Sequence, residues 1–313
     1  MLSRIADSLF WLNRYMERAD GLLRVAYTHY NLSLDKGILG SRTWRPVLEI
    51  FTHCSEEEIV DIENNTGAAL EKLLLDTNNQ NSLKAIVTRA RENARGAQDH
   101  ITKEVWEEVN SVYHLINQPS LKEKLYSSEA LHIIDVFSKH TTMYTGVTDI
   151  TMPRGIGWSF MNVGKYVERC FETIIMVDKQ FAQIGYDCNG VNDILQWRYL
   201  LLGLSGYELH LKTYRSTNYN RNVLHQVLFN QDFPHAVLYS LSRLDRYLKD
   251  IARENSTAEN TALLRSLGRL HSSVKFMDPD TLNNLTLQQF LEDIKNGLQD
   301  FSIQLGQVFF SYS

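Results

Sequence analysis

The feature that most constrains the fold of this chain is a stretch of sequence that occurs twice. Residues 8–19 and 159–170 align without a gap at one constant offset, 168 − 17 = 151 residues, and Ser, Tyr, Glu and Arg recur identically. Most other aligned positions keep their chemical class, as Leu12 and Val163 do. Two amphipathic helices could share four letters by chance, but here the apolar phase matches as well. Because the offset is close to half of 313 residues, we expect two related halves, each opening with a Tyr-x-Glu-Arg helix.

The second copy of this stretch predicts a buried helix that carries charges. At about 100° per residue, residues 160–176 are apolar almost all round, which is typical of a helix inside a protein. Glu168 and Arg169 would then be buried, and buried charges require partners. Neighbouring residues on a helix point about 100° apart, so these two cannot pair well with each other. We therefore expect the helices of Glu17 and Glu168 to lie close together, related by an approximate two-fold axis.

Composition and charge exclude several classes of protein. With 43% hydrophobic residues the chain has ample material for a core, and its net charge of −5 and pI near 6.1 do not suggest a nucleic-acid or anionic-membrane partner. The first seven residues carry charges where a signal peptide needs an apolar run, and no apolar stretch approaches the roughly 18 residues of a membrane span. We expect a cytoplasmic protein. The three cysteines share no CxxC spacing, so neither a disulfide framework nor a zinc site is indicated.

The apolar spacing predicts an all-α, multi-helix bundle without strands. The first helix should end at Gly37 and Gly40, Ser55 has the spacing of a capping box, and Ser82 is a suitable N-cap. The clearest break is residues 153–157, where a proline and two glycines precede the second copy of the repeat. The main helices are expected at residues 3–34, 68–75, 83–100, 102–118, 121–143, 157–184, 191–215, 221–229, 235–254, 259–276 and 286–311.

Few motifs indicate chemistry. Glu129 and His132 form one Glu-x-x-His, whereas a di-iron bundle needs two such motifs and further carboxylates. No P-loop, dinucleotide fingerprint or nucleophile elbow is present, so we expect no cofactor and no metal. A polar and aromatic segment around Tyr207, Glu208 and His210 either lines an internal cleft or faces water.

The helix expected at residues 83–100 is unusually rich in arginine. Arg91 and Arg95 lie one helical turn apart, with Glu92 between them. The spacing by itself favours a solvated face with internal ion pairs. Arg154, just before the second repeat, adds to the positive charge.

These residues resemble the alpha-E family, bacterial all-helical proteins with a Glu-Arg motif. Nearly the whole chain takes part in the resemblance, as a single domain, 1–313, with an internal pseudo-repeat of 1–150 and 152–313. Two positions depart from the family pattern, Asn13 where glycine is usual and Cys170 where alanine is usual, and both affect packing more than charge. The matching motifs are Arg14-Tyr15-Met16-Glu17-Arg18-Ala19, Arg91-Glu92-Asn93-Ala94-Arg95, Glu104-Val105-Trp106-Glu107, Arg154-Gly155-Ile156-Gly157-Trp158-Ser159-Phe160, Gly164-Lys165-Tyr166-Val167-Glu168-Arg169 and Asp232-Phe233-Pro234-His235.

The resemblance implies a companion of other proteins rather than a defined activity. Family members look like partners of circularly permuted ATP-grasp ligases and transglutaminase-like proteins, in systems that resemble peptide synthesis or modification. One hypothesis is therefore an accessory or scaffold protein that binds a peptide or a ligase through a polar, Glu/Arg-lined groove. The alternative is an amide-bond forming or transferring enzyme with Glu17 or Glu168 as acid or base and arginines as an anion clamp.

A third hypothesis is that the Glu-Arg pairs only join the two halves. A purely structural cluster should have every arginine neutralised by carboxylates, whereas a binding site should leave at least one guanidinium with donors to spare. The resemblance makes the Arg91–Arg95 segment a candidate for the same polar cluster as the Glu-Arg pairs, and the excess of positive charge around Arg91 favours binding. The candidate ligand-binding residues are Glu17, Arg18, Arg91, Glu92, Arg95, Arg154, Tyr166, Glu168 and Arg169.

Overall fold

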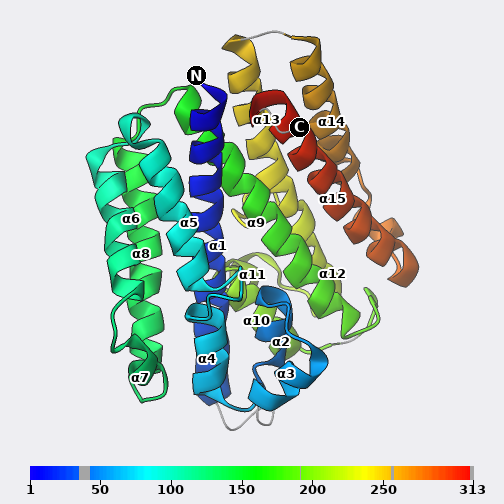
Figure 1. The fold of residues 1–313 in the computed structure, drawn as a ribbon. Helices are drawn as coiled ribbons and strands as arrows, with labels where there is room; N and C mark the ends of the chain where they lie inside the picture. The colour runs from blue at the N-terminus through cyan, green and yellow to red at the C-terminus, as the bar shows by residue number, and fades with distance from the viewer. Residues whose placement is uncertain (35–42, 191, 255–256, 311–313) are drawn as a thin grey trace. The chain divides into compact units, whose positions relative to one another are not determined.

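A computed structural model describes residues 1–34, 43–190, 192–254 and 257–310, and in this part of the chain every regular element is a helix (Figure 1). The prediction of an all-α bundle is confirmed. None of the helices described is both long enough and apolar enough to cross a membrane. The expected helix stop at Gly37 and Gly40 lies outside the described residues.

The chain divides into two compact units, which we call the N-terminal unit (Trp11–Pro153) and the C-terminal unit (Met1–Phe10 with Arg154–Ser313). The boundary falls within the predicted break at residues 153–157. Each Glu-Arg pair therefore belongs to a different unit. Whether the two halves share one plan, and whether their Glu-Arg helices are related by a two-fold axis, stay predictions.

The N-terminal unit is built around the long helix α1 (Ser3–Leu34), most of which belongs to it. Two hydrogen bonds fix α8 on α1: Tyr144 Oη donates to Asn13 Oδ1 within the buried interior, and Thr141 Oγ1 donates to Asp20 Oδ1 at 3.0 Å. The other helices of this unit are α2 (Arg45–Phe51), α3 (Glu56–Ile62), α4 (Thr66–Leu74), α5 (Leu83–Gly96), the 3₁₀ turn η1 (Gln98–His100), α6 (Lys103–Ile116), α7 (Leu121–Leu125) and α8 (Ala130–Thr151).

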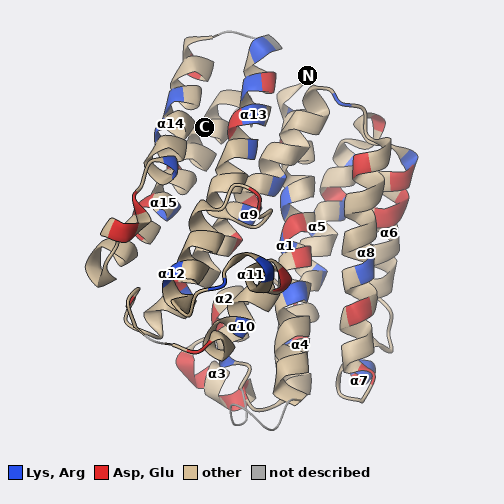
Figure 2. Cartoon of the chain, turned by 180° about the vertical axis from the view of Figure 1, so that it is seen from behind, with Lys and Arg blue, Asp and Glu red and all other residues tan. Residues whose placement is uncertain are grey.

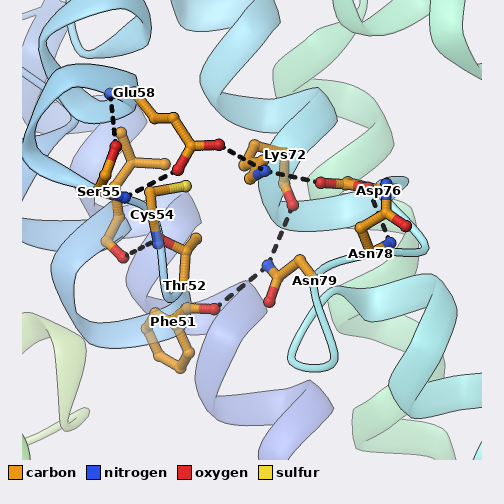
Figure 3. A network of polar contacts seen from close by, with 10 residues as sticks. Phe51, Thr52, Cys54, Ser55, Glu58, Lys72, Asp76, Asn78 and Asn79 are labelled. Atoms are coloured by element: carbon orange, nitrogen blue, oxygen red, sulfur yellow. Dashed lines mark hydrogen bonds and ion pairs between the residues drawn. The ribbon is translucent and has the colours of Figure 1, made fainter.

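A polar network holds the connection between α4 and α5 (Figure 3). Buried Asn79 donates from Nδ2 to the carbonyls of Phe51 and Lys72, at 3.2 and 3.1 Å. Its Oδ1 accepts from the backbone N–H of Asn81 at 3.0 Å. Lys72 pairs with Asp76 at 2.9 Å. These contacts therefore hold the loop that precedes α5 against α2 and α4.

Local signals at helix starts are confirmed. The capping box at Ser55 is complete, with the Ser55 hydroxyl accepting from Glu58 N–H and the Glu58 carboxylate accepting from Ser55 N–H. The Ser82 hydroxyl caps α5 by accepting from Ala85 N–H. Both caps depend on residues three positions apart, so the sequence alone was enough to place them.

The C-terminal unit is centred on α9 (Ile156–Ala182), which packs most extensively against α13 (Val237–Glu254). Cys170 is completely buried in α9, and burial raises the pKa of its thiol, so it packs as a small apolar residue. The remaining elements of this unit are α10 (Ile194–Gly203), α11 (Tyr207–Thr213), α12 (Tyr219–Leu224), the π-helical turn η2 (His225–Phe229), α14 (Ala258–Lys275), the 3₁₀ turn η3 (Pro279–Thr281), α15 (Asn284–Leu305) and the π-helical turn η4 (Gly306–Phe310).

The prediction of two long helices is wrong, because tertiary contacts divide each of them into two shorter helices. The helix expected at 121–143 is interrupted after Leu125, where the ring of Tyr126 packs against Gly67 and its hydroxyl donates to Glu71 at 2.8 Å. A Cβ at position 67 would lie 2.4 Å from that ring, so only glycine allows this approach.

The helix expected at 191–215 is split in the same way. Ser205 has a φ of 56°, which no α-helix accommodates, and separates α10 from α11. At the next residue a Cβ on Gly206 would lie 2.6 Å from the amide of Gln226 and 2.7 Å from the ring of Phe233. The break therefore depends on side chains that lie twenty or more residues further along the chain.

Candidate functional site

Arg91 lies on a prepared surface of the helical hairpin formed by α5 and α6. Its Nε donates to Asn110 Oδ1 at 2.6 Å, and its Cζ lies 4.4 Å from the ring centroid of Tyr113 and 5.8 Å from that of Trp106. Trp106, Asn110 and Tyr113 lie four and three residues apart, so they share one face of α6. Stacking on aromatic rings and one hydrogen bond hold the guanidinium plane in place. We call these four residues the Arg91 surface.

The Arg91 guanidinium keeps most of its donors available. A guanidinium has five N–H groups, and within the described residues only Asn110 accepts from that of Arg91. Arg95 and Glu92 are exposed, and no ion pair joins either of them to a described residue. The internal ion pairs of the solvated-face alternative are thus not found among the described residues, whereas the exposure of Glu92 and Arg95 fits a solvated face. The charge of Arg91 is also uncompensated by any carboxylate in the described part of the chain.

The first Glu-Arg pair lies elsewhere in the same unit. Glu17 is buried, with 6% of its surface exposed. Arg18 is half-buried, donates from Nη1 to Asn81 Oδ1 at 3.1 Å and has its Cζ 5.9 Å from the Tyr15 ring centroid. Both residues of the pair have further interaction partners. Arg18 is thus tied to the loop that Asn79 fixes at the start of α5, whereas Arg91 contacts α6.

The second Glu-Arg pair lies on α9. Glu168 is 7% exposed, as expected for a buried carboxylate, whereas Arg169 is only half-buried. Arg169 donates from Nη1 to the carbonyl of Pro234 at 3.4 Å, and its Cζ lies 5.5 Å from the ring centroid of Tyr166. Arg154 is exposed and stacks on Trp158, with its Cζ 3.8 Å from the ring. Arg154, Tyr166, Glu168 and Arg169 all belong to the C-terminal unit.

Sequence reasoning missed a group of residues beside Tyr166. The Tyr166 ring lies 6.2 Å from that of Tyr239 and 6.1 Å from that of Tyr247, the latter nearly parallel at 16°. Arg243, between the two tyrosines of α13, donates from Nη2 to Tyr239 Oη at 3.0 Å, and its Cζ lies 4.9 Å from the Tyr239 ring. Burial raises the pKa of Tyr166, against the opposing charge of Arg169. The sequence signal was a Tyr-x-x-x-Arg-x-x-x-Tyr spacing on one helical face.

The segment around His210, expected either to line an internal cleft or to face water, is divided between the interior and the surface. His210 is completely buried, and its Nδ1 hydrogen-bonds to Gln226 Oε1 at 2.8 Å. Because the amide nitrogen of Gln226 donates to the Gly206 carbonyl, Gln226 Oε1 must accept, and His210 carries its proton on Nδ1. Burial lowers the pKa of His210. Glu208 is exposed and lies 3.8 Å from Lys212.

No cluster of His, Cys, Asp or Glu in the described residues could hold a metal ion. The two residues of the Glu-x-x-His motif are both exposed, and Glu129 pairs with Lys124 at 3.6 Å. The polar side chains around Arg91 and Tyr166 are instead arginines, tyrosines and an amide, and guanidinium groups recognise anions.

The sequence comparisons identify the family of the chain. The model of the Alpha-E family, described as a predicted alpha-helical domain with a conserved ER motif, matches residues 1–310, and the chain belongs to this family. Glu-Arg occurs in the sequence only at Glu17-Arg18 and Glu168-Arg169. No curated protein and no solved structure matches the chain.

Proposed function

We propose that this Alpha-E protein is an accessory protein of a peptide synthesis or modification system and binds an acidic protein segment at the Arg91 surface. The segment belongs to a peptide substrate or to a partner such as a circularly permuted ATP-grasp ligase or a transglutaminase-like protein. The single observation that carries the proposal is the Arg91 guanidinium, which is held in place by α6 but has no carboxylate partner in the described residues.

The chemistry of the surface favours a carboxylate. The free edge of a guanidinium matches the two oxygens of a carboxylate and binds them through parallel hydrogen bonds. Asn110 uses its oxygen for Arg91, which leaves its amide N–H groups as further donors. Exposed Arg95, one turn along α5, adds a second positive charge. An aspartate or glutamate side chain of a partner fits this set of donors.

The aromatic side chains favour a protein or peptide over a free ion. Trp106 and Tyr113 are only partly buried, so their rings contribute area to a contact besides holding Arg91. Tryptophan, tyrosine and arginine are the residues that most often dominate the binding energy of protein interfaces. A ligand with apolar groups beside its carboxylate would contact both the Arg91 guanidinium and the two aromatic rings.

Calorimetric titration with acidic peptides tests the proposal. We expect an Asp/Glu-containing peptide to bind, and the Arg91→Gln variant to bind it at least about tenfold more weakly, since a charged hydrogen bond contributes about 1.5–3 kcal/mol. Arg265→Gln, which changes an exposed arginine on α14, is the matched control and should bind as the wild type does. Equal binding of the Asn/Gln version of the peptide, or an unchanged affinity of Arg91→Gln, would contradict the proposal.

The partner is tested separately. We expect an ATP-grasp or transglutaminase-like protein encoded beside this gene to bind the purified chain directly, and Arg91→Gln to weaken that complex. If the neighbouring protein binds wild type and Arg91→Gln equally, the accessory role is kept but the Arg91 surface is not its interface.

A further inference from the structure

We propose that the Tyr166, Tyr239, Arg243, Arg246 and Tyr247 cluster, which we call the tyrosine–arginine cluster, binds a phosphate monoester. The cluster lies in the C-terminal unit, on adjacent faces of α9 and α13, and the proposal does not depend on the Arg91 surface. Basic residues recur along α13 (Figure 2). The cluster is where they meet aromatic rings from a second helix.

The helical spacing on α13 creates the cluster. Tyr239, Arg243 and Tyr247 follow one another at four-residue intervals, so their side chains share one face of the helix. That face meets Tyr166 of α9, whose ring lies 6.2 and 6.1 Å from the rings of Tyr239 and Tyr247. Arg246 extends the group, with its Cζ 5.9 Å from the Tyr247 ring.

The cluster has more hydrogen-bond donors than acceptors. Tyr239 Oη accepts from Arg243, so its own proton can be donated elsewhere. No described residue accepts from the hydroxyls of Tyr166, Tyr239 or Tyr247, or from the remaining N–H groups of Arg243. Three phenol protons and most of a guanidinium fork therefore have no acceptor among the described residues. Such a set of donors recognises an oxyanion.

The charge of the cluster matches a dianion. Neither Arg243 nor Arg246 forms an ion pair with a carboxylate of the described residues, and the nearby Asp245 pairs with Lys249 at 2.6 Å. The half-buried Arg243 is surrounded by tyrosines, and the hydrogen bond to Tyr239 raises its pKa although burial opposes this. A phosphate monoester carries about −1.5 to −2 charges at pH 7 and offers three acceptor oxygens, enough to engage both cations and the hydroxyls.

Titration with phenyl phosphate, inorganic phosphate and AMP tests the proposal and separates three sources of the same group. We expect saturable binding of at least one of them with one site per chain, and a loss of at least about tenfold in Arg243→Gln. Tyr239→Phe removes one hydroxyl, keeps the ring and should weaken binding by about threefold to tenfold. Arg269→Gln, an exposed arginine of α14, is the matched control and should leave binding unchanged.

The controls make the proposal open to refutation. Affinity should fall between about pH 7.5 and pH 5.5, because the monoester loses its second charge near pH 6. Arg243→Lys keeps the positive charge and is the second variant to titrate if Arg243→Gln folds poorly. The effect of Arg243→Gln should persist in an Arg91→Gln background, because the proposal does not depend on the Arg91 surface. Benzoate binding as tight as phenyl phosphate, no binding tighter than about 1 mM, or equal binding by Arg243→Gln would overturn it.

Discussion

The hydrogen bond between Tyr144 and Asn13 offers the sharpest test of the packing of α8 on α1. Asn13 is 5% exposed and occupies the position that aligns with Gly164 in the second copy of the repeat. Burial raises the pKa of Tyr144, so its hydroxyl stays protonated and donates to Asn13 Oδ1. The perturbation is Asn13→Gly, which gives the first copy the residue of the second.

The expected cost follows from three contributions. The hydrogen bond itself stabilises the folded protein by about 1 kcal/mol, and this stabilisation is lost. The Tyr144 hydroxyl is then buried without an acceptor, which costs about 1–3 kcal/mol. Glycine within a helix adds about 0.5 kcal/mol. We therefore expect Asn13→Gly to lower the free energy of unfolding by about 2–4 kcal/mol, most of it through Tyr144.

A double-mutant cycle isolates the contact. Tyr144→Phe removes the hydroxyl that Asn13→Gly would leave without an acceptor, so Asn13→Gly should cost only about 1 kcal/mol in that background, with a coupling energy of about 1–3 kcal/mol. Urea unfolding followed by tryptophan fluorescence and by circular dichroism gives the four free energies. The control is Asn31→Gly near the end of α1, where the amide donates only to the Tyr27 carbonyl of its own helix. A coupling energy near zero would refute the reasoning.

Three further predictions concern other buried polar groups. Asn79→Ala removes the donor of two hydrogen bonds to carbonyls and should lower the free energy of unfolding by about 1–3 kcal/mol, measured by urea unfolding. Because burial lowers the pKa of His210, the unfolded state binds more protons than the folded state below about pH 6.5. The free energy of unfolding should therefore decrease as the pH is lowered, by at most about 1.4 kcal/mol per pH unit. His210→Asn should reduce this pH dependence, and exposed His53→Asn should not. Glu168→Ala should lower stability by about 3–5 kcal/mol in thermal melts, whereas exposed Glu259→Ala should not, and equal melts would show that the carboxylate has no buried partner.

The parts of the fold that the sequence predicted are those determined by near neighbours. The full extent of α1, Ser3–Leu34, followed from its apolar periodicity, and the caps at Ser55 and Ser82 followed from residues three positions away. The breaks at Tyr126 and Ser205 were not predicted. They depend on Gly67 and on Gln226, which meet these turns only after the chain has folded.

In the candidate site, too, the features set by near neighbours were predicted and those set by distant residues were not. The burial of Glu168 was expected from the repeat, whereas Arg169, also expected to be buried, is only half-buried, and the burial of Glu17 was not predicted. An arginine with donors to spare was expected as well. The partner surface of Arg91 was not, because Asn110 is nineteen residues away and has no charge. Arg243 was missed because its environment is made by tyrosines, including Tyr166 from a helix far earlier in the chain.

These contacts distinguish the two Glu-Arg dipeptides from Arg91 and Arg243, the two arginines for which we propose ligands. Glu17 and Glu168 are buried, and every residue of the two Glu-Arg pairs has an interaction partner, which is the behaviour expected of groups that hold a fold together. Arg91 and Arg243 lie outside the Glu-Arg dipeptides, rest on aromatic rings and keep most of their N–H donors. A substitution in the motif should therefore lower stability first, whereas a substitution of either arginine should lower binding first. On this view a search of the family for ligand specificity should compare the residues facing Arg91 and Arg243 and not the Glu-Arg dipeptide itself.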